Sequence, residues 1–383
     1  MSDDRSNEAS TAIDLARRKR DALARERDNP ARSPRRPRSG AVSRLVRNRR
    51  ARAGALLFAG IALCALNADW LASDLPIVCR WHGALYIAPC ITHPRALAEA
   101  DCAALRASRW RGDWLLAPLI EHGPRRSDPS SAELAPPGTP GHPLGTDAYG
   151  RDVFARLVHG ARTTVLVGVA AAALLVGLGV GLGAIAGVAG GVIDGIVARA
   201  VEALTAIPSL VLALVVGGLY PSSAALFWTL ALTRWTEVAR VVRAEVISTA
   251  RTDYALAARA LGASPARVLL THILPSAFSS ALVAAAFAVA SFIATETSID
   301  FLLGLRAASN AAPSWAEMMA EARSHPGAWW LVVLPAGSLL MLLMSFHLVG
   351  DAARAAFDPT LARQDDGDTG RGSEKGWLAR RTN

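Results

Sequence analysis

One stretch of this sequence places Asp and Arg residues a few positions apart, so that their carboxylate and guanidinium groups could form ion pairs. In HPLGTDAYGRDVFAR (142–156), two glycine-containing triplets are typical of tight turns that their own side chains stabilise. Asp and Arg in such turns can form ion pairs, which fix a loop rather than transform a substrate. We therefore expect a structural role at the outer rim of the protein, meaning its extracytoplasmic edge. The residues concerned are Gly145, Thr146, Asp147, Gly150, Arg151 and Asp152.

Two acidic residues, Glu202 and Glu296, fall inside long apolar segments, each near a segment end. An ionisable side chain within a membrane is costly, so it is by default a candidate for a transport pathway. A solvated residue, or the partner of an arginine, is the simpler interpretation of an acid near a segment end. Both residues are candidates for a translocation path.

Three of the four cysteines, Cys79, Cys90 and Cys102, lie in one polar segment. One disulfide among them is chemically allowed if that segment lies outside the cytoplasm, and their spacing does not choose the pair. A zinc site formed by these cysteines with His82 or His93 is an alternative. We expect no metal centre.

No enzyme motif is evident. The only lysines are Lys19 and Lys375, and neither stands in the Gly-Lys-Ser/Thr context of a P-loop. The sequence also lacks the HExxH pattern of zinc proteases, the GxSxG nucleophile elbow and the EF-hand loop. We therefore predict that the chain is not an enzyme and uses no cofactor.

The elements that must position these residues are mainly apolar helices. The chain is 52% hydrophobic and 19% charged, and it contains runs near the roughly 20 residues that cross a bilayer. The second run is rich in glycine, which lets membrane helices approach closely, so we expect it to be buried. The fourth is the weakest, because Arg234 and Glu237 enter its end. We predict an all-α integral membrane protein with six transmembrane helices, near 53–70, 163–189, 200–220, 222–238, 276–297 and 328–349.

Charge orients these segments. The connection 234–275 holds six arginines against three acids, and residues 1–52 hold sixteen Lys and Arg against seven acids. Positive charge beside a span favours the cytoplasm, so both connections and both termini are predicted to be cytoplasmic. The plan is a basic tail (1–52), a first span (53–70), an extracytoplasmic loop domain (71–162), a five-helix core (163–350) with a cytoplasmic loop (239–275), and a cytoplasmic tail (351–383).

Two further features concern the tail and the loop domain. The net charge of +9 also fits nucleic-acid binding, but its position beside a span favours anionic lipid headgroups.

Residues 76–89 alternate aromatic and β-branched side chains around His82-Gly83, which predicts a hairpin with a two-residue turn. Residues 127–143 are rich in Pro, Gly and Ser and predict an extended connector.

The cytoplasmic loop contains DYALAARALGASPARVLLTHILP (253–275), which predicts two short helices around a corner. Thr252 is suited to cap the first helix, Gly262 to end it, and Ser264-Pro265 to begin the second. From these residues alone, docking on lipid and docking on another protein stay equally open. One face of the first helix consists of Tyr254, Ala257, Ala258 and Leu261.

The same stretch resembles the cytoplasmic signature of permease subunits of binding-protein-dependent ABC importers. That signature has Glu-Ala-Ala, three residues, Gly, and a terminal Leu-Pro; here Leu256 stands in place of the Glu. The resemblance implies a coupling helix seated in a cleft of an ATPase subunit. The matching positions are Ala257, Ala258, Gly262, Leu274 and Pro275. The residues implied for the ATPase contact are Asp253, Tyr254, Ala257, Ala258, Arg259, Gly262 and Pro275.

Residues 142–168 resemble the entry to the second span of dipeptide and oligopeptide permeases of the DppC/OppC type. Further matches extend the resemblance over roughly 41–360. The hairpin and the long loop around it resemble a subgroup of peptide and microcin C importers, the YejE-like branch. The identity of the transported compound stays open.

The resemblance implies a permease subunit in the bacterial inner membrane that imports peptides while a partner hydrolyses ATP. Implied partners are a homologous second permease, two cytoplasmic ATPase subunits, an extracytoplasmic solute-binding protein, membrane lipids and the peptide, with no nucleic acid. One alternative is a proton-coupled secondary transporter, which would show intramembrane acids and repeat symmetry. Another is a membrane scaffold whose basic tail binds lipid.

Overall fold

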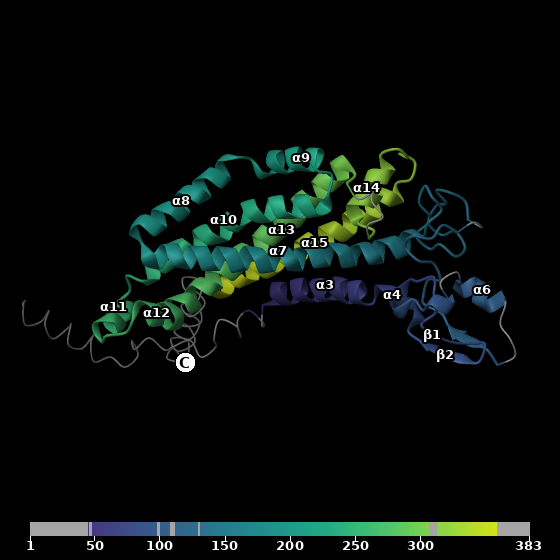
Figure 1. Ribbon diagram of the computed structural model, residues 1–383, viewed down its shortest axis with the longest axis horizontal. Helices are drawn as coiled ribbons and strands as arrows, with labels where there is room; N and C mark the ends of the chain where they lie inside the picture. Colours follow the sequence, from purple (N-terminus) through teal and green to yellow (C-terminus); the bar gives the residue numbers. More distant parts are fainter. Residues whose placement is uncertain are drawn as a thin grey trace, which may run out of the picture. The chain divides into compact units, whose positions relative to one another are not determined.

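The computed structural model describes residue 45 and residues 48–97, 100–107, 112–128, 131–305 and 312–357. Most of the two predicted tails, 1–52 and 351–383, lie outside these residues. Helices dominate what is described (Figure 1). In chain order they are α3 (Arg49–Leu66), α4 (Ala68–Leu71), α5 (Pro89–Thr92), η2 (a 3-10 turn, Arg95–Leu97), α6 (Cys102–Ala107), α7 (Val153–Ala189), α8 (Gly191–Ala206), α9 (Ser209–Leu219), α10 (Ser223–Thr249), α11 (Asp253–Ala260), α12 (Pro265–Val268), η3 (a π-helical turn, Leu269–Ile273), α13 (Leu274–Leu303), α14 (Trp315–Ala322) and α15 (Trp330–Phe357).

Several helices have the length and composition of membrane spans. Three stretches qualify outright: Val153–Ala189, Pro265–Leu303 and Trp330–Phe357. The pair α8 and α9 would make a fourth span, but it is bent by 71°. The span expected over 200–220 thus coincides with a bent helix pair, because Pro208 disfavours helical backbone at Ile207, which is extended (φ −95°, ψ 123°).

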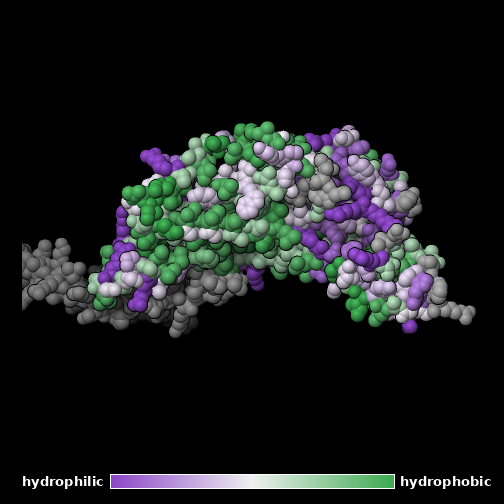
Figure 2. Space-filling view, viewed as in Figure 1, coloured by the Kyte–Doolittle hydropathy of each residue, from purple (hydrophilic) through white to green (hydrophobic). Residues whose placement is uncertain are grey.

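Helices α3 and α10 are less apolar than the helices that qualify as spans. The first turn of α3 holds Arg49, Arg50 and Arg52, and charged residues interrupt the second half of α10. A six-span count thus stays a prediction. On the face drawn in Figure 2, hydrophobic residues cover the middle of the helical part, and hydrophilic residues gather toward α11 and toward α14.

The glycine-rich helix α7 packs against α10 through glycines on one side. A Cβ added at Gly179 would lie 2.6 Å from the Val238 Cβ, and one at Gly183 would lie 2.6 Å from the Ala239 carbonyl oxygen. Gly187 faces Val246 in the same way. This four-residue spacing places small residues on one helix face and lets two backbones approach closely. The burial predicted for this helix holds for that face, whereas a Cβ at Gly177 or Gly181 would meet open space.

The fifth predicted span is longer than 276–297. Helix α12, the π-helical turn η3 and α13 follow one another without a break, so Pro265–Leu303 qualifies as one span. Pro275 lies just after the π-helical turn, and because proline has no backbone N–H, this interruption lies where one hydrogen bond of the helix is missing. The second short helix predicted within 253–275 is therefore the beginning of the long helix rather than a separate element.

The loop domain contains a small antiparallel sheet in the order β2-β1-β3. Strand β1 (Val78–Trp81) pairs with β2 (Ala84–Ile87) across the turn His82-Gly83, so the predicted hairpin is confirmed. Strand β3 (Trp114–Leu116), which the sequence did not suggest, covers the other edge of β1. Leu75, Leu97 and Leu105 pack with Cys79 and Cys90 beneath this sheet.

Candidate functional site

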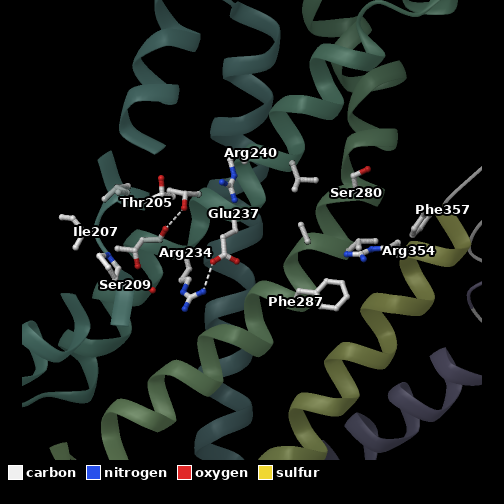
Figure 3. A pocket seen from close by; sticks show the side chains of 17 residues that line it. Thr205, Ile207, Ser209, Arg234, Glu237, Arg240, Ser280, Phe287, Arg354 and Phe357 are labelled. Carbon is white, nitrogen blue, oxygen red and sulfur yellow. Dashed lines mark hydrogen bonds and ion pairs between the residues drawn. The ribbon is translucent and has the colours of Figure 1, made fainter. Parts of the chain in front are cut away.

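A cavity of about 830 Å³ opens between the helices of the core. Its walls come from the bend between α8 and α9, the middle of α10, the first half of α13 and the end of α15 (Figure 3). The bend contributes Ile207, Pro208 and Ser209. The break in this predicted span therefore gives the cavity a wall that a straight helix would not supply.

Arg234 of α10 is the most heavily bonded charge in the cavity wall. Its Nη1 donates to Glu237 Oε1 at 2.8 Å and to Ser291 Oγ of α13 at 2.9 Å. Its Nη2 donates to Thr295 Oγ1 at 3.1 Å, while its buried Nε has no hydrogen-bond partner. These bonds join α10 to α13 and hold the Arg234–Glu237 pair at the cavity surface.

Two further arginines leave the cavity with an excess of positive charge. Arg240 lies six residues along α10 from Arg234, and Arg354 comes from α15. Neither pairs with a carboxylate within the described part of the chain, and Arg354 lies over the Phe287 ring at 5.0 Å. Three arginines against one glutamate, beside apolar walls, suit a solute that has both a carboxylate and apolar groups.

The two acids predicted for a translocation path do not line this cavity. Glu202 lies on α8 with its side chain 62% exposed and pairs with Arg199 at 2.9 Å. Glu296 is buried well inside α13 rather than near a span end. Sequence reasoning treated Arg234 and Glu237 only as charges that weaken the fourth span. An Arg–Glu pair three residues apart in an apolar segment was the signal that could have pointed to this cavity.

Helix α11 is the first helix of the loop 239–275, which is predicted to be cytoplasmic. Its N-cap residue Thr252 makes no side-chain cap; instead the hydroxyl donates to the Thr249 carbonyl at 2.6 Å, so the predicted cap is wrong. The end is as predicted: Gly262 has φ +85°, and Ala263 N donates to the Ala258 carbonyl at 3.1 Å. This bond is typical of a Schellman motif, which requires a left-handed backbone conformation at the residue after the helix, here Gly262.

One face of α11 is buried and the rest is open. Ala255 is fully buried, and Ala258 is half-buried against the core. Tyr254 is 50% exposed and stacks on His272 at 6.4 Å between ring centroids. Leu256, which replaces the Glu of the signature, is 49% exposed. The remaining predicted contact residues Asp253, Ala257, Arg259 and Gly262 are exposed, as is Leu261.

The segments flanking α11 are tied together by Glu245 of α10. Its carboxylate accepts from Ser276 Oγ at 3.0 Å and from Ser280 Oγ at 3.4 Å, both on α13. These bonds link the last turn of α10 to the first turns of α13, the two elements on either side of α11 and α12. Sequence reasoning missed Glu245.

The predicted outer-rim residues form a buried ion-pair network. Asp147 Oδ1 accepts from the backbone N–H groups of Tyr149 (2.8 Å) and Arg151 (2.9 Å), and its Oδ2 accepts from Arg151 Nε at 2.6 Å. Thr146 Oγ1 bridges the Ala135 amide and the Ala132 carbonyl. The predicted side-chain-bonded turn is present.

The centre of this network is Arg156 of α7, which is fully buried and contacts the Asp147 carboxylate. Its Nη1 lies 2.7 Å from Glu321 Oε2, and its Nη2 lies 3.0 Å from Glu317 Oε1, both on α14. Burial raises the pKa of the Glu317 carboxyl, and the Arg156 and Arg151 guanidinium groups act in the opposite direction. Sequence reasoning missed both glutamates of α14.

Gly145 and Asp152 complete the rim. Gly145 has φ +82°, and a Cβ there would collide with the backbone at Ala135 and Pro136, so only glycine fits. Asp152 caps α7, with Oδ1 accepting from Ala155 N at 2.7 Å. Gly150 also has a positive φ, of +69°. The structure thus brings all six predicted rim residues together at the start of α7.

Comparison with known proteins gives a consistent result. The family described as binding-protein-dependent transport system inner membrane component matches residues 179–363. The inner membrane ABC transporter permease protein YejE of Escherichia coli K12 is 33% identical over 324 residues, which cover 80% of this chain and 92% of that protein. The oligopeptide transport system permease protein OppC of Bacillus subtilis is 35% identical over 59% of this chain and 74% of its own length. The dipeptide transport system permease protein DppC of Escherichia coli K12 is 38% identical over 60% of this chain and 78% of its own length.

Proposed function

The chain belongs to the inner membrane components of binding-protein-dependent transport systems, and from this membership we propose that it is the permease subunit of an ATP-driven importer of peptides. Relatives named for dipeptide and oligopeptide transport support the substrate class. A transport subunit of this family is not itself an ATPase, which agrees with the lack of a P-loop in the sequence.

The observation that bears most on the coupling is the exposed face of α11. A helix of eight residues is anchored through Ala255 and leaves Tyr254, Leu256 and Leu261 uncovered. We assign this face to a cleft on a cytoplasmic ATPase subunit. ATP binding would draw two such subunits together and displace α11, and the Glu245 link would pass that displacement to α10 and α13.

The full complex would contain this chain, a homologous second permease, two ATPase subunits and an extracytoplasmic solute-binding protein, with lipid around the spans. Six spans with both termini in the cytoplasm would come from α3, α7, the bent α8–α9 pair, α10, α13 and α15. The charges of α10 are compatible with a span because Arg234, Glu237 and Arg240 face the cavity rather than lipid.

The cavity of about 830 Å³ would be this subunit's share of the translocation path. Its positive charge would attract the C-terminal carboxylate that every unmodified peptide has, and the surrounding Phe287 and Val241 would accept apolar side chains. We propose this cavity in place of Glu202 and Glu296, neither of which lines it.

The test is the energy source for uptake. The complex is reconstituted in proteoliposomes with its solute-binding protein, and uptake of a labelled dipeptide is followed with ATP or with an imposed proton gradient. The proposal expects uptake that requires ATP and survives a proton ionophore. Uptake that follows the proton gradient without ATP would identify a secondary transporter, and no uptake under either condition would favour a scaffold.

A further inference from the structure

We propose that His122, Asp128 and His142 form a binding site for a divalent transition-metal cation such as Zn²⁺ in the loop domain. Each of these residues offers one ligand atom, and the three atoms all lie within 4.8 Å of one another. His122 and Asp128 come from the segment after β3, and His142 comes from the loop that leads into α7. The site is separate from the core cavity and from α11.

Two of the ligand atoms already have the spacing of a tetrahedral zinc site. His142 Nε2 and Asp128 Oδ2 are 3.3 Å apart. Bonds from Zn²⁺ to nitrogen or oxygen of about 2.0–2.2 Å place neighbouring ligand atoms roughly 3.3–3.5 Å apart in a tetrahedron. The His122 ring stacks on the His142 ring with 4.4 Å between centroids, so a side-chain rotation of His122 would bring it onto the same ion.

The environment of His142 has the second feature expected of a metal ligand. Its Nδ1 lies 2.7 Å from Asp152 Oδ2, and both side chains are buried. A carboxylate on one ring nitrogen fixes the orientation of the imidazole and directs the other nitrogen toward the metal. Asp152 is held in turn by its cap on α7. A bridge in which His142 merely joins two carboxylates is the alternative that an experiment must separate from metal binding.

The surroundings of the site favour a cation and leave it accessible. His122 and Asp128 border a cavity of about 820 Å³. Three further carboxylates line this cavity: Asp101 pairs with Arg126 at 2.8 Å, Glu121 pairs with Arg106 at 2.6 Å, and Asp74 accepts from the Gly123 amide at 2.7 Å. Three protein ligands and an open side suit an ion that keeps a water molecule. Two imidazoles and one carboxylate favour zinc-like ions over Mg²⁺ or Ca²⁺.

A bound ion would have a structural consequence at the start of α7. It would join the segment that ends at Asp128 to the loop containing His142, and through Asp152 it would stabilise the first turn of α7. Asp147 of the outer-rim network lies five residues before Asp152 in the chain. The ion would therefore fix the loop domain against the rim, independently of which solute is transported.

The test uses the purified full-length chain, stripped of metal with a chelator and titrated with Zn²⁺ against a fluorescent zinc indicator. Matched variants are His122→Asn in the site and His93→Asn, which alters another histidine of the loop domain that is exposed. The wild type and His93→Asn should bind one Zn²⁺ per chain with equal affinity. His122→Asn should bind more than about 100-fold more weakly, since loss of a second-shell partner alone costs 10–100-fold.

A second variant protects the result against misfolding. Asp128→Asn keeps the shape of the ligand and should show the same loss, with thermal unfolding of the metal-free chain confirming that each variant is folded. A ten-fold excess of Mg²⁺ over Zn²⁺ should not displace the zinc. Equal zinc binding by the wild type and His122→Asn, or equal losses in His122→Asn and His93→Asn, would overturn the proposal.

Discussion

Arg156 on α7 and Glu321 on α14 lie 165 residues apart in the chain, yet Nη1 of the arginine is 2.7 Å from Oε2 of the glutamate. This contact joins the start of one long helix to the short helix that precedes α15. It belongs to a network in which one fully buried guanidinium serves the carboxylates of Asp147, Glu317 and Glu321.

Replacing Arg156 with Met should therefore destabilise the chain severely. The three carboxylates would lose their buried cation and keep only the partly exposed Arg151, and breaking a buried pair in this way costs about 3–5 kcal/mol. Thermal unfolding of the purified chain in detergent checks this. Arg199→Met is the control, since its pair with Glu202 is exposed and its loss should not change the midpoint measurably. Equal midpoints for the two variants would show that the network has no stabilising role.

The α7–α10 contact gives a matched pair of glycine substitutions. Gly183→Ala should lower stability by about 1–3 kcal/mol, because the added methyl group meets the Ala239 carbonyl and both helices must shift. Gly181→Ala adds the same group on the opposite face, where nothing lies within 4 Å, and should be neutral or slightly stabilising. The retention of helical structure on heating measures both. A larger effect at Gly181 than at Gly183 would contradict the packing.

The loop-domain thiols should resist alkylation at neutral pH. Cys79, Cys90 and Cys102 are buried and free, and burial raises the pKa of the Cys102 thiol to about 12. The reactive thiolate of Cys102 is therefore scarce at pH 8 and grows only as the pH rises toward that value. Maleimide labelling of the reduced, native chain should be slow at Cys102 and become fast in denaturing detergent. An added cysteine in the exposed turn, His82→Cys, is the positive control, and native labelling of Cys102 as fast as this control would refute the burial.

Glu237 should influence which peptides pass. Among the described residues that line the core cavity, Glu237 is the single acid, so Glu237→Gln leaves three arginines there without a carboxylate. Uptake of a dipeptide with a basic side chain should fall relative to one with an acidic side chain by roughly ten-fold, which corresponds to about 1.4 kcal/mol. Glu202→Gln changes an exposed acid outside the cavity and should leave the ratio unchanged. A shift caused by Glu202→Gln alone would place the path elsewhere.

The features that the sequence predicted well are local in the chain. The helix end at Gly262 and the helix start at Ser264-Pro265 depend on backbone within four residues of each. Likewise, Asp147 accepts hydrogen bonds from the amides of Tyr149 and Arg151, two and four residues away. The hairpin likewise follows from a two-residue turn. Family resemblance added an ATPase as the expected partner of α11, where periodicity left lipid and protein equally open.

What escaped prediction depends on distant residues meeting. Arg156 finds Glu321, and His142 finds Asp128, only after the loop domain has folded against the rim. The core cavity requires the bend at Pro208. A proline in the middle of an apolar run indicates a possible bend, but the length of the run by itself predicts a continuous span. Thr252 failed as a cap because its hydroxyl bonds to the preceding turn, an alternative open to any serine or threonine.

Helix α11 as the docking surface for an ATPase is the central claim, and Ala257 tests it most directly. Ala257 is exposed, whereas Ala258 packs on its own chain, so a bulky group at Ala257 disturbs a partner rather than the fold. The measurement is ATP-driven dipeptide uptake and ATPase co-purification for Ala257→Trp beside Ala107→Trp, an exposed control on α6. Ala257→Trp should lose both while remaining folded, and Ala107→Trp should keep both. Wild-type uptake and co-purification by Ala257→Trp would contradict the docking of α11 on an ATPase.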